Sequence, residues 1–315
     1  MKYTNILKQS WDITWKNKYL WFFGLFAALL GNGGDLDIIV RGFDHDNKFF
    51  MFGWQQFSQT GIFNKNIFAN IALLSVKEPL TLFLSLGTLL IFTFMVGFLI
   101  WMIISSQIAI VSNSVRIITG KKHNIKEGIK KGEENFWKVF ILNMLLKLSI
   151  FFIFSFILFA LFIKEAMLQS VIYVVLFILF LILAVILSFI IKYAICFVII
   201  KGYTVINSLR AGWCLFVKNW LISLEMAFLL FVLNFLVVFL LAPFFFVFLI
   251  FSKVVLYFGV WFLFVSSACL FLLIVALVGA ILSTFQISSW TSLFVELISR
   301  GGVSKLIRLF EKNKN

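Results

Sequence analysis

The chain has 315 residues, of which 63% are hydrophobic and 13% charged, and its mean hydropathy is +1.08. A soluble core of this length cannot bury so much apolar surface, so the composition excludes a soluble globular domain and predicts a polytopic membrane protein. Only two prolines and 18 glycines are available for turns, which favours long helices over the strands of an outer-membrane barrel. The net charge of +14 does not indicate nucleic-acid binding, because the basic residues cluster beside the apolar segments.

The apolar runs predict six membrane spans. In chain order they cover residues 19–31, 79–115, 139–163, about 168–191, 221–251 and 254–295. The first run gives only about 20 Å of helix, against a hydrocarbon core of about 30 Å, unless the helix begins near Trp15 with Lys16 and Lys18 reaching the headgroups. A signal-peptide segment is the alternative for this run, and the long aromatic stretch before it argues against that.

Residues 32–78 form the large hydrophilic excursion, which we expect to be an irregular extracytoplasmic loop. Its acidic cluster comprises Asp35, Asp37, Asp44, His45 and Asp46. Such a cluster could hold a divalent cation, but a solvated acidic loop is the favoured interpretation. His45 and His123 are expected on opposite sides of the membrane, which excludes a two-histidine site. We therefore assign no metal, no other cofactor and no catalytic residue.

A short motif occurs three times, each time at the entrance to an apolar segment. A basic residue stands two positions before a small residue, and a lysine stands six positions after it. The matched positions are Lys8, Ser10 and Lys16; Lys130, Gly132 and Lys138; and Arg210, Gly212 and Lys218. Tryptophan and lysine favour the headgroup layer, so we predict an interfacial amphipathic helix at each copy. The predicted anchors are Trp11, Trp15, Lys16, Trp137, Lys138, Trp213, Lys218 and Trp220.

The motif divides a single all-α membrane domain, residues 1–315, into three repeats of one amphipathic helix and two spans. The repeats cover about residues 1–121, 122–202 and 203–315. With six crossings, most of the 27 lysines and arginines lie on one side. Because basic loops stay on the cytoplasmic side, both termini are predicted to be cytoplasmic, in a bacterial inner membrane.

Two charges fall inside predicted spans, Lys147 in the third and Glu225 in the fifth. Counted from the entry lysines Lys138 and Lys218, their depths differ by about 3 Å. We hypothesise an interhelical ion pair, since charges within the membrane tend to pair. The alternative is a snorkelling Lys147 and an unrelated interfacial Glu225.

A Trp, Lys and Asn entry stands before the predicted basic-inside bundle, at Trp15, Lys16, Asn17, Lys218, Asn219 and Trp220. In this entry the chain resembles the membrane domain attached to some glycerophosphodiester phosphodiesterases, and the uncharacterised stand-alone bacterial relatives of that domain. The resemblance implies a six-span bundle without catalytic power, because the phosphodiesterase domain is absent. The long outer loop departs from the compact pattern of the family.

These features predict a non-enzymatic membrane protein with a role in lipid handling or envelope organisation. Membrane lipids are the expected partners, together with a further membrane protein or a second copy of the chain. A small transporter or permease for a solute or lipid is the alternative, because internal repeats also build transporters. An intramembrane enzyme is disfavoured by the missing catalytic constellations.

Overall fold

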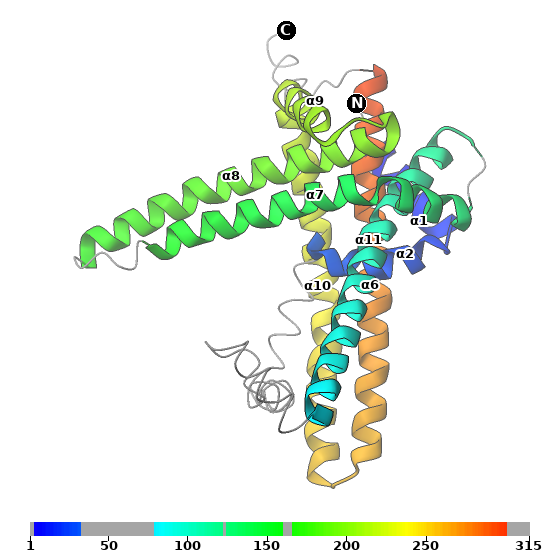
Figure 1. The fold of residues 1–315 in the computed structure, drawn as a ribbon, viewed down its shortest axis with the longest axis vertical. Helices are drawn as coiled ribbons and strands as arrows, with labels where there is room; N and C mark the ends of the chain where they lie inside the picture. The colour runs from blue at the N-terminus through cyan, green and yellow to red at the C-terminus, as the bar shows by residue number, and fades with distance from the viewer. Residues whose placement is uncertain (1–2, 33–78, 122–123, 160–165, 301–315) are drawn as a thin grey trace. The chain divides into compact units, whose positions relative to one another are not determined.

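The computed structural model describes residues 3–32, 79–121, 124–159 and 166–300, and every regular element in these ranges is a helix (Figure 1). In chain order the elements are α1 (Tyr3–Lys16), α2 (Leu20–Ala27), the π-helix η1 (Ala28–Asn32), α6 (Pro79–Ile118), α7 (Ile125–Phe159), α8 (Ala166–Lys201), α9 (Val205–Lys218), α10 (Trp220–Tyr257) and α11 (Trp261–Arg300). Apart from Asn32, the predicted outer loop 32–78 and its acidic cluster lie outside the described residues.

Five helices are long and apolar enough to cross a membrane, which confirms the prediction of an all-α polytopic membrane protein. The candidate spans are Leu86–Ile118, Ile125–Phe152, Val174–Lys201, Trp220–Val255 and Trp261–Ser299. They correspond to the second to sixth predicted spans. The chain is therefore a multi-pass membrane protein.

The first predicted span is a shorter apolar helix, Leu20–Leu30. The suggestion that this helix begins near Trp15 is wrong, because α1 ends at Lys16 and the chain turns before α2. At this turn the backbone N–H of Leu20 donates to the carbonyl of Asn17, at 2.9 Å. Whether the short helix crosses the membrane stays a prediction.

Two predicted boundaries also differ from the structure. The second motif copy is not a separate helix, because α7 begins at Ile125 and continues without a break to Phe159. Most of the predicted basic loop 116–138 is consequently helical. At the other boundary, α10 continues past Lys253 to Tyr257, and the turn lies at Gly259, whose φ is +71°. Glycine adopts this left-handed conformation without steric cost.

The contacts divide the chain into two compact parts, Leu29–Ile103 and Met1–Ala28 with Ile104–Asn315. Within the larger part, α11 packs against α1, α2, α8 and α10, while α7 and α9 both pack against α8. Most of its buried apolar side chains come from α1, α2 and three stretches, residues 104–111 of α6, 189–199 of α8 and 280–297 of α11, and α7 and α10 add a few more. The core of this part is thus built at one end of the long helices.

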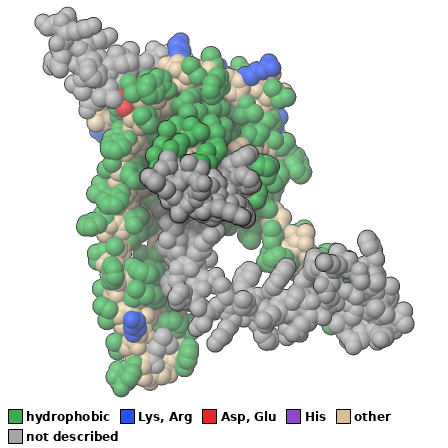
Figure 2. All heavy atoms as spheres, turned by 90° about the vertical axis from the view of Figure 1, so that its left-hand side faces the viewer, with side chains coloured by type: hydrophobic (Ala, Val, Ile, Leu, Met, Phe, Trp, Pro, Cys, Tyr) green, Lys and Arg blue, Asp and Glu red, His purple; other side chains and the backbone are tan. Residues whose placement is uncertain are grey.

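The apolar remainder of the spans is mostly exposed. Figure 2 shows hydrophobic side chains over most of the described surface of one face, with Lys and Arg side chains mainly at its upper edge. Exposed apolar side chains along a spanning helix are what lipid tails would cover.

Candidate functional site: the packed polar end of the bundle

The small residue of each motif copy lies at a contact between two helices. In α1, Ser10 Oγ donates to Ser292 Oγ of α11 at 3.3 Å. In α7, a Cβ added to Gly132 would lie 3.0 Å from Ser105 Cβ of α6. In α9, a Cβ added to Gly212 would lie 2.7 Å from the backbone oxygen of Ile190 in α8. A small side chain is required because it lets the helices approach closely.

The residue four positions before the small residue is buried as well, at Ile6, Gly128 and Ser208. Residues four apart share a helix face, so each copy presents the same buried stripe. At Gly128 an added Cβ would lie 2.7 Å from Asn113 Nδ2. The shared spacing therefore marks a packing face, which the sequence analysis did not recognise.

The three stripes have a consistent order of partners. The stripe of α7 packs on α6, and that of α9 packs on α8, so each contacts the last helix of the preceding repeat. The stripe of α1 packs on α11, the last helix of the third repeat. The contacts of the three repeats thus follow one another in a closed cycle.

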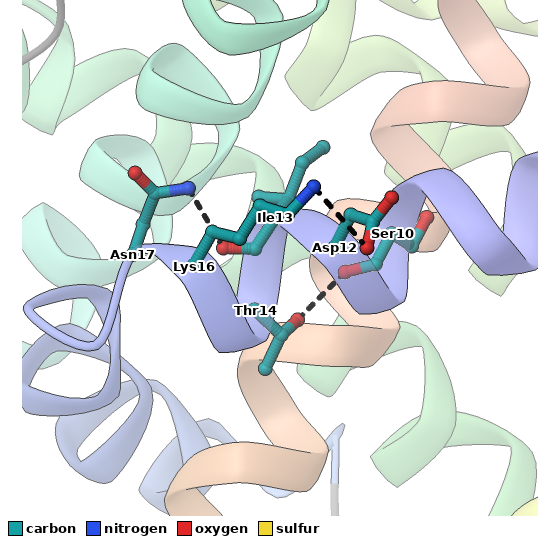
Figure 3. Close-up of polar contacts among 6 residues, drawn as sticks. All are labelled: Ser10, Asp12, Ile13, Thr14, Lys16 and Asn17. Atoms are coloured by element: carbon teal, nitrogen blue, oxygen red, sulfur yellow. Dashed lines mark hydrogen bonds and ion pairs between the residues drawn. The ribbon is translucent and has the colours of Figure 1, made fainter.

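In two copies an asparagine follows the motif lysine at the position where the helix ends. Asn17 Nδ2 donates to the carbonyl oxygen of Ile13 at 2.9 Å (Figure 3), and Asn219 Nδ2 donates to that of Leu215 at 3.1 Å. Asn143 makes the same bond to Val139 within α7, so the bond by itself does not end a helix. The second copy has Val139 at this position, and there the helix continues.

The tryptophans among the predicted anchors are all exposed. Trp11 is 50% exposed, Trp137 70% and Trp213 54%, and Trp15 and Trp220 are also exposed. The entry lysines of the first and third copies, Lys16 and Lys218, are exposed, and Lys138 is half-buried. Lys16 pairs with Asp12 at 3.6 Å (Figure 3). Their role as membrane anchors stays a prediction.

Trp11, Trp15 and Trp21 form an aromatic ladder across the break after α1, with ring centroids 5.4 and 5.3 Å apart. Trp21 Nε1 donates to the carbonyl oxygen of Thr14 at 2.9 Å. These ring contacts and this hydrogen bond connect the end of α1 to the start of α2.

Polar side chains connect the helices inside the packed end. Ser114 Oγ of α6 and Ser288 Oγ of α11 lie 3.0 Å apart, and Thr284 Oγ1 donates to the carbonyl oxygen of Leu20 at 3.2 Å. Asn143 Nδ2 of α7 donates to Gln107 Oε1 of α6 at 2.9 Å. The polar tracts at the carboxyl-terminal ends of α6 and α11 are thus mostly buried and pair the helices.

Some buried polar atoms in this end have no hydrogen-bond partner among the described residues. They include both amide atoms of Asn113 and the hydroxyls of Ser105, Ser283 and Ser289. Asn113 is fully buried, with an exposed fraction of 0%. An unsatisfied buried polar group costs about 1–3 kcal/mol, so hydrogen bonds to these atoms from water or a polar solute would lower the free energy of the folded state.

Lys192 of α8 is the second unusual group. Its Nζ lies 4.7 Å from the ring centroid of Trp290 in α11. Among the described residues, no carboxylate lies within ion-pair distance of it. A cation–π contact contributes about 0.5–2 kcal/mol, whereas a lysine in the middle of a membrane helix costs about 2.5–3.5 kcal/mol. The ring therefore offsets only part of the cost.

Sequence reasoning used Lys192 only as an orientation charge and did not single out Asn113. The signal for Lys192 was present, because it interrupts an otherwise uncharged run from Ala166 to Ile200. Of the predicted pair, Lys147 is exposed on α7 and Glu225 is half-buried on α10. Their pairing stays a prediction.

Comparison of the chain with family models, curated proteins and solved structures found no match. The resemblance to the membrane domain of glycerophosphodiester phosphodiesterases accordingly stays a prediction.

Proposed function

We propose that this chain is a non-enzymatic protein of the bacterial inner membrane that handles or organises lipids of the cytoplasmic leaflet, with both termini on the cytoplasmic side. One observation carries the proposal. In each of the three motif copies the small residue faces another helix, while tryptophans remain exposed. Exposed indole rings beside lysines suit the headgroup layer of an anionic membrane.

The proposal predicts that the protein selects anionic lipid through the motif lysines. The purified full chain is reconstituted with spin-labelled phosphatidylglycerol or phosphatidylcholine, and the motionally restricted lipid fraction is measured by electron spin resonance. The wild type should favour phosphatidylglycerol, because each lysine near an anionic surface contributes about 1 kcal/mol. Replacing Lys16, Lys138 and Lys218 together by glutamine should remove most of that preference.

Lys253→Gln is the matched control, because Lys253 is an exposed lysine at the opposite end of α10 from the third copy. This variant should keep the wild-type preference. A wild type that holds both lipids equally, or a triple variant with unchanged selectivity, would contradict the proposal.

The buried, unpartnered polar atoms favour a second candidate, a transporter of small uncharged solutes. The donors and acceptors at Asn113, Ser105, Ser283 and Ser289 are uncharged, as a site for a polyol would require. Proteoliposomes mixed with glycerol would report transport as a change in light scattering. Glycerol entry that is abolished by Asn113→Leu would favour this candidate, and permeability equal to that of empty liposomes would eliminate glycerol transport.

A further inference from the structure

Lys192 is the one residue between Phe189 and Ile199 that is not buried. Its neighbours Ile191 and Tyr193 are each 1% exposed. The Lys192 stem therefore runs through the packed end of the bundle, while part of the side chain stays open to the exterior. A long apolar stem with a charged head can hold this position.

Within the described ranges no carboxylate pairs with the ammonium of Lys192. On the motif helices α1 and α7, lysines have carboxylate partners: Lys16 lies 3.6 Å from Asp12, and Lys131 lies 2.7 Å from Glu134. Lys192 lies instead over the face of Trp290, which attracts a cation without neutralising it. Its ammonium carries three donors, so the site calls for an anion that accepts hydrogen bonds.

Buried aromatic rings pack around Trp290, the ring beneath this ammonium. Phe189 lies 5.5 Å from Trp290 and 5.7 Å from Phe216 of α9, measured between ring centroids. The hydroxyl of Tyr193 lies 2.6 Å from Ser223 Oγ of α10, which fixes that ring in place. Phe189, Tyr193 and Trp290 are only 4%, 1% and 8% exposed, so these rings hold Lys192 in position and the ammonium is the group that an anion would meet.

We propose that Lys192, above the Trp290 ring, binds the phosphate diester of an anionic phospholipid at the exterior of α8. The proposal rests on the proposed lipid-handling function. It is supported by the place of Lys192 on the candidate span Val174–Lys201, because its partly exposed side chain can reach the lipid that surrounds such a helix. A free phosphate ion would satisfy the same ammonium, and the experiment separates the two sources.

The experiment measures lipid binding to the delipidated full chain by native mass spectrometry and thermal unfolding. The probes are dioleoylphosphatidylglycerol, dioleoylphosphatidylcholine and sodium phosphate. Lys192→Met is the main variant, because methionine keeps a long apolar stem and removes the charge. Since a hydrogen bond to a charged group contributes about 1.5–3 kcal/mol, K192M should bind phosphatidylglycerol about ten- to hundredfold more weakly.

Lys201→Met is the matched control. Lys201 is an exposed lysine at the end of α8 with its own cation–π contact, 5.5 Å from the ring of Phe197. K201M should bind phosphatidylglycerol within about twofold of the wild type, as expected for an exposed charge with little energetic weight. Trp290→Phe keeps the aromatic packing but weakens the cation–π contact. If K192M does not fold, W290F tests the site instead, and its affinity for phosphatidylglycerol should fall severalfold.

Two results would overturn the proposal. The first is phosphatidylglycerol binding that is unchanged in K192M, or in W290F where K192M does not fold. The second is stabilisation of the wild type by sodium phosphate but not by phosphatidylglycerol. The second result would assign the site to free phosphate. If the triple variant of Lys16, Lys138 and Lys218 loses lipid selectivity while K192M keeps it, the proposed function stands and the Lys192 site fails. If neither variant changes selectivity, both proposals fail.

Discussion

Replacing Gly212 by alanine tests the close contact between α9 and α8. An added Cβ would lie 2.7 Å from the carbonyl oxygen of Ile190 and 3.2 Å from the backbone nitrogen of Ala194. Both are backbone atoms, so the helices must move apart, and overpacking of this kind costs about 1–3 kcal/mol. Alanine also raises helix propensity by about 1 kcal/mol relative to glycine. The net expectation for G212A is a loss of up to about 2 kcal/mol.

Gly279→Ala supplies the matched measurement, because Gly279 lies within α11 and an added Cβ meets nothing within 4 Å. The free energy of unfolding of G279A should therefore rise by about 1 kcal/mol, the difference in helix propensity between alanine and glycine. Unfolding of both variants in mild detergent, titrated with SDS and followed by tryptophan fluorescence, gives the two free energies. The reasoning is refuted if G212A is stabilised as much as G279A, because then no close approach exists at Gly212.

Asn113→Ala should leave the free energy of unfolding unchanged or raise it, because this side chain makes no hydrogen bond with the described residues. Asn143→Ala should lower the free energy of unfolding by about 1–3 kcal/mol, because the bond to Gln107 is lost. Equal losses for the two variants in the same SDS titration would show that Asn113 is hydrogen-bonded. A cysteine at Lys130 should resist a membrane-impermeant maleimide in intact cells while one at His45 reacts, and the reverse pattern would overturn the predicted orientation.

The positions of the spans along the chain were predictable from the sequence because a membrane-spanning helix requires a long run of apolar residues. The sequence also separates the two motif copies that end in a helix break from the copy that does not. Lys16 and Lys218 are followed by asparagine, and Lys138 is followed by valine. Because the three copies were treated as equivalent, α7 was wrongly divided.

The partners of the motif helices could not be predicted. A stripe of small residues shows that some helix approaches closely, but its spacing is the same whichever helix that is. That Ser10 meets Ser292, from the far end of the chain, follows only from the three-dimensional arrangement. The same applies to Lys192, whose contact with Trp290 joins residues on α8 and α11.

The contact of α1 with α11 makes the joint between the third and first repeats similar in kind to the two joints along the chain. Each repeat offers a stripe to the repeat before it and a receiving helix to the repeat after it, which is a head-to-tail association. When such an association closes by rotation, it produces a ring of defined size. Three separate chains, each with one such stripe and one receiving helix, would carry the surfaces needed to assemble in this way. The packing is thus compatible with descent from a homotrimer whose subunits became fused end to end.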